Sequence, residues 1–150
     1  MDEVRNSLDF QRQSMRFQCQ RAMTSTLYHS CFSFPECEFG LLEVKCPDFG
    51  IRMMFLEHVF TGLKEYVENF NRKCARYGMS MNCELVEWSE DELKIRLSNR
   101  AAEPDRIDGV GYELSELYCL RADDETGLIT MSDSELEFKK IPVEKRRWRG

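Results

Sequence analysis

Residues 51–77 read IRMMFLEHVFTGLKEYVENFNRKCARY and carry the strongest periodic signal in the chain. Large apolar side chains recur there every three or four residues, which is the spacing of one face of an α-helix. Asp48 precedes the stretch and is a suitable N-cap, and Gly78 follows it as a left-handed closing residue. We therefore predict a long helix over about residues 49–77. Its core face consists of Leu56, Val59, Phe60, Leu63, Tyr66, Val67, Phe70, Cys74 and Tyr77.

The sequence before this helix alternates between apolar and polar residues, which predicts strands. The alternation covers Met15–Gln20, Thr24–Phe34 and Gly40–Cys46. Residues 1–14 contain little that is apolar, and we expect a short helix or a frayed end there.

After the helix, Met79–Leu85 and Leu93–Leu97 alternate on either side of a polar turn, which predicts an antiparallel hairpin with one wet face. Val86 and Trp88 have the opposite parity to Leu85, which indicates a bulge or a two-faced edge strand. A loop is expected over Asn99–Gly111. The remaining predicted strands are Tyr112–Arg121, Leu128–Met131 and Leu136–Ile141, the first two joined by a hairpin turn at Ala122–Gly127.

Strands on both sides of one long helix indicate the α+β class, with an antiparallel, curved sheet packed on a central helix. The chain has 150 residues, which suits one domain over residues 1–143. No apolar run approaches the roughly 20 residues that a membrane span requires. Seven cysteines without a C-x-x-C pair and without a signal peptide predict reduced thiols in an intracellular protein of the cytoplasm or nucleus.

A basic tail follows the predicted domain at residues 144–150. It contains Lys145, Arg146, Arg147, Trp148 and Arg149, although the chain as a whole has a net charge of −6. Clustered cations beside an aromatic ring can hold phosphates and stack on a base. The tail is thus a candidate contact for nucleic acid or an acidic partner, a localisation signal, or a solvated end.

Two patterns in the sequence could carry chemistry. His29, Cys31, Cys37 and Cys46 are weak candidates for zinc ligands, because their spacing matches no common zinc motif. Nothing in the sequence marks either histidine, His29 or His58, as the oriented base of a cysteine nucleophile. We therefore expect no catalytic residue, no metal and no cofactor.

The predicted helix also has a second apolar stripe in its N-terminal half. Ile51, Met54, Phe55 and His58 recur at helical spacing on roughly the side opposite the core face, and Gly62 continues the row. Something should cover these residues, either residues 1–23 of the same chain or a partner protein or second copy.

These observations predict a non-catalytic protein-interaction module, either a homodimer or a subunit of a larger complex, with the second stripe as the binding surface. A nucleic-acid-binding protein that uses the tail and exposed aromatic residues is the alternative. A small enzyme or zinc protein is the third interpretation.

Overall fold

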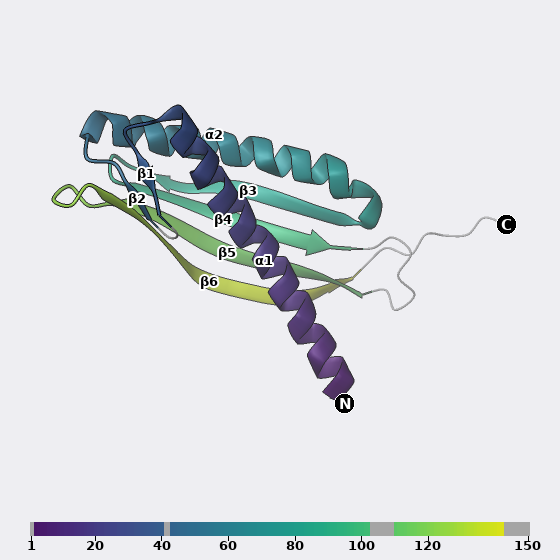
Figure 1. Cartoon of the computed structure of the whole chain (residues 1–150). Helices are drawn as coiled ribbons and strands as arrows, with labels where there is room; N and C mark the ends of the chain where they lie inside the picture. The colour runs from purple at the N-terminus through teal and green to yellow at the C-terminus, as the bar shows by residue number, and fades with distance from the viewer. Residues whose placement is uncertain (1, 41–42, 103–109, 143–150) are drawn as a thin grey trace.

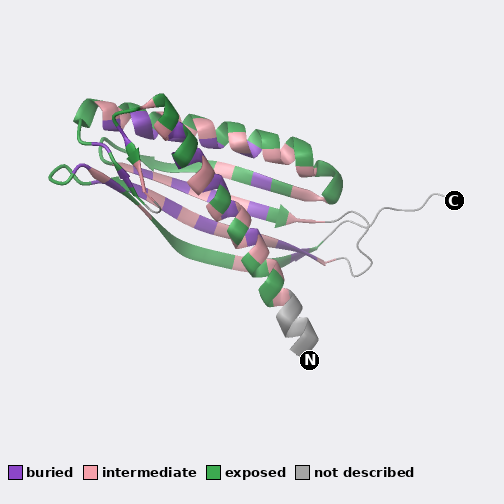
Figure 2. Cartoon of the chain, viewed as in Figure 1, coloured by how far each residue is buried: buried purple, intermediate pink, exposed green. Residues whose placement is uncertain are grey.

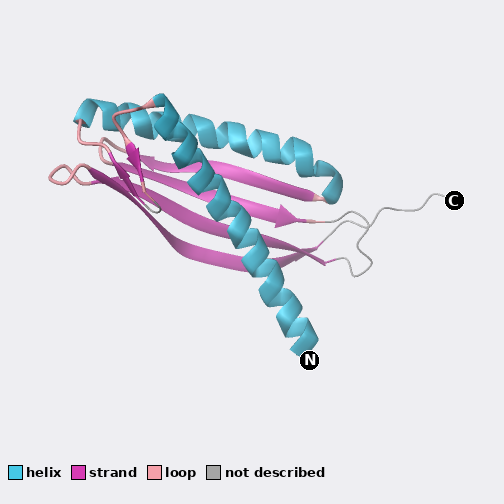
Figure 3. Ribbon diagram, viewed as in Figure 1, coloured by secondary structure: helices cyan, strands magenta, loops and turns pink. Residues whose placement is uncertain are grey.

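The protein is described by a computed structural model over residues 2–40, 43–102 and 110–142, with no side-chain description for residues 2–7. Two helices lie on one face of a six-stranded antiparallel sheet that curls into a half-barrel (Figure 1), so the predicted α+β class is confirmed. The helices are α1 (Asp2–Ser33) and α2 (Phe49–Cys74), the latter closed by a 3-10 turn at Ala75–Tyr77. The strands are β1 (Glu38–Phe39), β2 (Glu43–Lys45), β3 (Met79–Trp88), β4 (Glu92–Ala101), β5 (Val110–Ala122) and β6 (Leu128–Pro142), in the spatial order β1-β2-β6-β5-β4-β3 (Figure 3).

Helix α2 confirms the long helix that was predicted over about residues 49–77. The Asp48 carboxylate accepts a hydrogen bond from the backbone N–H of Ile51 at 3.0 Å, and Gly78 closes the following 3-10 turn with φ 70°. Both ends are therefore set by local capping. On the predicted core face, the residues that are buried are Leu56, Val59, Leu63 and Val67, whereas Tyr77 at the far end is exposed.

The two strands predicted over Met15–Gln20 and Thr24–Phe34 are wrong, because one continuous helix, α1, occupies this region. Met15 and Cys19 lie one helical turn apart on its buried face, and Phe17 lies on the opposite, exposed face. A helix with apolar residues on two opposite faces produces short alternating runs that imitate a half-buried strand.

The predicted hairpins are confirmed. Strands β3 and β4 pair with a register shift between Leu85 and Glu87, which is the expected bulge. Residues 128–142 form one long strand, β6, rather than two, and it bulges opposite the segment from Ser115 to Leu117 of β5. The loop predicted over Asn99–Gly111 is wrong at both of its ends, since Asn99–Ala101 belong to β4 and Val110–Gly111 to β5.

The core lies between the concave face of the sheet and the two helices (Figure 2). Helix α1 crosses the sheet obliquely over β4 and β5, while α2 runs along β3 (Figure 1). The Asn71 side chain joins α2 to β3 through two hydrogen bonds with the Met81 backbone, of 2.7 and 2.9 Å. Among the described residues, no helix is apolar over a length that would cross a bilayer.

Candidate functional site on the outer face of the first helix

The second stripe of α2 lies mostly beneath α1, so most of it is not an outer surface. Phe55 is fully buried, and the Phe34 ring contacts it edge-to-face with centroids 5.9 Å apart. The His58 Nδ1 and the Ser30 hydroxyl are 3.0 Å apart, within hydrogen-bonding distance, and a Cβ at Gly62 would meet the Thr26 side chain at 3.2 Å.

The contacts that cover this stripe come from Thr26, Ser30 and Phe34 of the same chain, which lie just beyond residues 1–23, one of the two covers predicted from the sequence. Ile51 is half-buried, and Met54, at 58% exposure, is the member of the stripe that solvent reaches freely. A partner could contact Phe55 only if α1 first moved away from α2.

An exposed aromatic row runs instead along the outside of α1. Phe10 and Phe32 are each 69% exposed, Phe17 is 62% exposed and Tyr28 is 46% exposed. At about 100° per residue, these four positions fall within about 60° of one another around the helix. They lie opposite Met15, Cys19 and Ala22, which face the core. We call these four residues the aromatic row.

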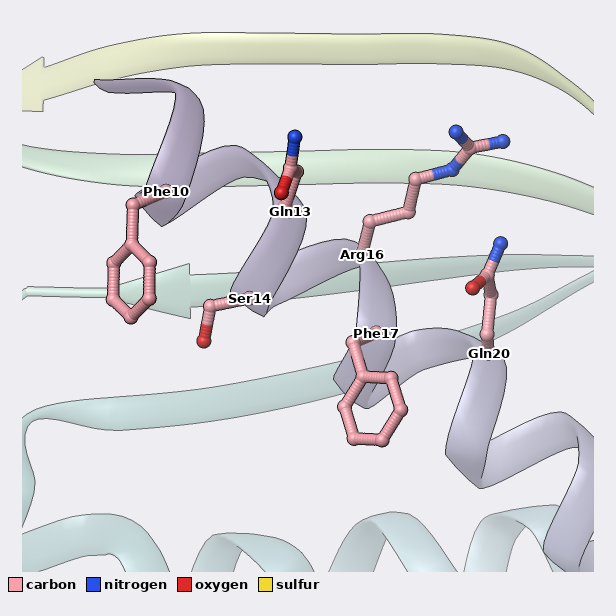
Figure 4. Close-up of a pocket in the computed structure, with 6 residues that line it drawn as sticks. All are labelled: Phe10, Gln13, Ser14, Arg16, Phe17 and Gln20. Atoms are coloured by element: carbon pink, nitrogen blue, oxygen red, sulfur yellow. The ribbon is translucent and has the colours of Figure 1, made fainter. Parts of the chain in front are cut away.

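Two shallow depressions of about 520 Å³ each follow the aromatic row. Figure 4 shows the first, in which Phe10 and Phe17 project to one side of the helix while Arg16 and Gln20 project to the other. The second lies between Phe17 and Tyr28 and is closed at one end by Phe39 of β1. Together the depressions extend the row into a groove that reaches from α1 to the β1–β2 hairpin.

The C-terminal end of the row is an aromatic cluster. The Tyr28 ring packs edge-to-face against Phe32 at 5.0 Å, His29 at 5.6 Å and Phe39 at 5.3 Å between centroids. Such contacts hold the rings in fixed orientations. This end of the row is therefore preorganised.

Arg21 is the cation within the row. It is exposed, and it forms no ion pair with any residue that the structure describes. Arg12 forms an ion pair with Asp9 at 3.4 Å, and Arg16 forms one with Asp133 of β6 at 2.9 Å. The centre of the aromatic row thus carries one positive charge that no described residue pairs with.

A buried polar cluster lies beneath α1 on the concave face of the sheet. The Glu116 carboxyl is 3.3 Å from the Arg16 Nε, and burial together with a hydrogen bond to Asp133 raises its pKa to about 7. The same hydrogen bond and the Arg16 charge lower the pKa of Asp133. Burial, followed by the charge of Glu116, raises the pKa of the neighbouring Tyr118.

The raised pKa of Glu116 and the lowered pKa of Asp133 favour a protonated Glu116 beside an ionised Asp133 below about pH 7. The cluster borders a cavity of about 260 Å³ lined by Arg16, Gln20, Thr24, Tyr118, Met131, Ser132 and Asp133. The β6 bulge lies directly opposite Glu116, and Glu135 within it has a positive φ of 50°. Sequence reasoning missed this cluster, because its members come from α1, β5 and β6, which only the strand register and the placement of the helix bring together.

The four weak zinc candidates separate into a cysteine cluster and a remote histidine. Cys37 and Cys46 are both buried and their sulfur atoms are 2.7 Å apart. His29 is exposed and contacts Tyr28 and Phe32 rather than the thiols. No group of three or more potential ligands suits a metal ion within the described ranges. Residues 145–149, the tail candidates, lie outside the described residues, as does the expected domain boundary at 143.

No family model and no curated protein matches the chain. A search of solved structures finds a similarity to the X-ray crystal structure of RV0760c from Mycobacterium tuberculosis, with 21% sequence identity over 52% of this chain and a TM-score of 0.24. The match covers 60% of that chain, less than two thirds of its length. A similarity of this size carries no inference about fold or function.

Proposed function

We propose that this protein is a non-catalytic protein-interaction module and that the aromatic row of α1 binds a helix of a partner protein. The observation that supports this most is the exposure of Phe10, Phe17, Tyr28 and Phe32 on the helix face opposite the core. Each large apolar side chain left in water forgoes about 1.5–3 kcal/mol relative to full burial. Exposed large apolar side chains that gather on one face mark interaction surfaces, and aromatic side chains are frequent binding anchors.

The shape of the surface favours a helix as the bound element. From Phe10 to Phe32 the row spans 22 positions, or about 33 Å of helix at 1.5 Å per residue. It is long and narrow, with depressions between successive rings. An amphipathic helix lying along it would place its i, i+3/i+4 and i+7 side chains in those depressions.

Arg21 determines which helix fits. It lies midway between Phe10 and Phe32, so a two-fold antiparallel pairing of two copies that matched those two rings would bring Arg21 against its own copy. Two like charges at the centre of an apolar contact are repulsive. An acidic side chain between the apolar anchors of the partner helix would instead pair with Arg21. The proposed occupant is therefore a different protein that presents an apolar helix with a central carboxylate.

The test uses two synthetic amphipathic helical peptides with Leu anchors that differ only in one central residue of the apolar face, Glu or Lys. Binding to the full chain is followed by fluorescence anisotropy. We expect the Glu peptide to bind about fivefold more tightly, equivalent to about 1 kcal/mol for a largely exposed ion pair. The preference should shrink at high salt, because such pairs are screened.

Three variants make the result specific. Phe17→Ala should lower the affinity for both peptides by at least about tenfold, as expected for an aromatic anchor. Arg21→Glu should reverse the preference between the peptides. Tyr77→Ala removes an aromatic residue of similar exposure, 53%, in the 3-10 turn after α2 and should leave the binding of both peptides unchanged. The proposal is wrong if neither Phe17→Ala nor Arg21→Glu affects binding. If light scattering shows a dimer that Phe17→Ala dissociates, the occupant is a second copy instead.

A further inference from the structure

Cys37 and Cys46 face each other at the base of the β1–β2 hairpin. The strand register pairs Glu38 with Lys45 and Phe39 with Val44, so the next pair in that register is Cys37 with Cys46. Both side chains are buried, at 6% and 0% exposure, and their sulfur atoms are 2.7 Å apart. That separation is shorter than an ordinary contact between two thiols.

The backbone around the two cysteines suits a covalent bond between them. The Cys37 N–H donates to the Phe34 carbonyl and the Cys46 N–H donates to the Gly127 carbonyl, so neither cysteine donates to the other. They lie one step beyond the last strand pair, at the position that would be a non-hydrogen-bonded pair if the ladder continued. In such a pair the Cα atoms lie about 4.5 Å apart, which is within the range that a disulfide spans. Bond formation requires the sulfur atoms to approach by about 0.7 Å, to roughly 2.05 Å.

We propose that Cys37 and Cys46 are a redox-active pair that converts reversibly between two thiols and a cross-strand disulfide, with a low-molecular-weight disulfide such as glutathione disulfide as the oxidant. One cysteine thiolate attacks glutathione disulfide, forms a mixed disulfide and releases one glutathione thiolate. The second cysteine thiolate then attacks the mixed disulfide and releases the other. The two protons lost by the cysteines end on the two glutathione molecules, so two protein thiols and one glutathione disulfide give one protein disulfide and two glutathiones.

The surroundings of the pair predict slow exchange. Burial raises the pKa of Cys37, and its hydrogen bond with Cys46 raises it further, so the thiolate is scarce at neutral pH. Attack also requires local opening of the hairpin, because both sulfur atoms are shielded. Cys31 is half-buried and near enough for its charge to affect Cys37, so it is the rival partner that the experiment must distinguish.

The experiment incubates the full chain in buffers of defined ratio of reduced to oxidised glutathione, quenches it with acid, and alkylates the free thiols with N-ethylmaleimide. Intact mass gives the number of protected cysteines, and peptide mapping identifies them. We expect two of the seven cysteines to become protected, joined in one cross-linked peptide that contains Cys37 and Cys46. Dithiothreitol should restore all seven thiols, and oxidation should be about tenfold faster for each unit rise in pH below the thiol pKa.

Two serine variants complete the design. Cys37→Ser should form at most a mixed disulfide with glutathione, whereas Cys119→Ser, which changes a half-buried thiol on β5, should still form the cross-link. Full alkylation of all seven cysteines at every glutathione ratio would overturn the proposal, as would a cross-link from Cys31 to either cysteine. One zinc ion per chain that only a chelator removes would also overturn it, since the thiols would then be ligands. Each of these outcomes is measured on the wild-type chain, so the conclusion holds even if a variant fails to fold.

Discussion

Gly127 shows how a single residue joins two parts of the molecule. It has φ +71°, and a Cβ built on it would lie 2.9 Å from the Cα of Pro47. Its carbonyl also accepts the 2.7 Å hydrogen bond from the Cys46 N–H. The β5–β6 turn and the segment that leads into α2 therefore approach more closely than any side chain at this position would allow.

We predict that Gly127→Ala lowers the free energy of unfolding by about 1–3 kcal/mol, because it combines a left-handed backbone with a backbone clash. The matched control is Gly50→Ala in the first turn of α2, where the nearest atom to the new Cβ is Asp48 Oδ1 at 3.4 Å. Alanine favours helix over glycine by up to about 1 kcal/mol, so this variant should be neutral or stabilising. Urea denaturation measures both. Equal losses for the two variants would contradict the close-approach argument.

At the scale of the element, α1 has two apolar faces with different roles. Met23 and Met15 lie on the buried face and contribute to the core beside α2 and the sheet. Phe17 and Phe10 lie on the exposed face and contribute little to the folded monomer. We therefore expect the buried face of α1 to stabilise the monomer and the exposed face to bind the partner.

Alanine substitutions on α1 test this separation. Met23→Ala should lower the free energy of unfolding by about 2–5 kcal/mol, since it removes a fully buried side chain and leaves a cavity. Phe17→Ala, at 62% exposure, should change it by less than about 0.5 kcal/mol. Chemical denaturation gives both values. A large loss for Phe17→Ala would mean that the aromatic row supports the monomer rather than a partner.

At the scale of the whole molecule, α1, β5 and β6 meet at Glu116. The groups around its carboxyl are Arg16 and Cys19 from α1, Tyr118 from β5 and Asp133 from β6. Burial is the largest cause of its raised pKa, followed by the hydrogen bond to Asp133. The proton on Glu116 is therefore coupled to the packing of the helix on the sheet.

This coupling predicts how stability depends on pH. The pKa of Glu116 is about 7 in the folded state against an ordinary value of 4.5, so between these values the folded state holds a proton that the unfolded state has released. The contribution of Glu116 to the free energy of unfolding is then largest below pH 4.5 and falls as pH rises to about 7, by up to about 1.4 kcal/mol per pH unit. The pKa of Asp133 is lowered from 3.8, so the titration of Asp133 affects stability only below the range from pH 4.5 to 7.

Glu116→Gln serves as the test, because glutamine imitates the protonated acid at every pH. Urea denaturation from pH 4 to pH 8 gives the free energy of unfolding of the variant and of the wild type. In the difference between them, the contributions of the other titrating groups cancel. We expect the variant to become more stable relative to the wild type as the pH rises from about 4.5 to about 7. A difference that does not vary with pH would show that Glu116 titrates normally.

The sequence alone determined the parts of the fold that depend on local interactions. The 3.6-residue period, the Asp48 cap and the closing Gly78 define α2, and alternation around polar turns defines the hairpins of β3–β4 and β5–β6. Even the bulge near Val86 follows from a local change of parity. These signals arise from neighbours within a few positions along the chain, so no tertiary information is needed to read them.

Only the tertiary structure decided the identity of α1 and everything that depends on it. Alternating positions such as Met15, Phe17 and Cys19 fit a strand and a two-faced helix equally well, and the helix is favoured because its buried face fits between α2 and the sheet. The spacing of Phe10, Phe17, Tyr28 and Phe32 is helical, but it becomes a signal only once the segment is known to be a helix.

The same limit applies to the candidate sites. Three features depend on distances across elements. They are the contact of Phe34 with Phe55, the contact of Cys37 with Cys46, and the raised pKa of Glu116 beside Asp133. Such distances are fixed by strand register and helix placement, which the packing of the whole core selects. Periodicity shows which face of an element is apolar, but the partner of that face is decided by the fold.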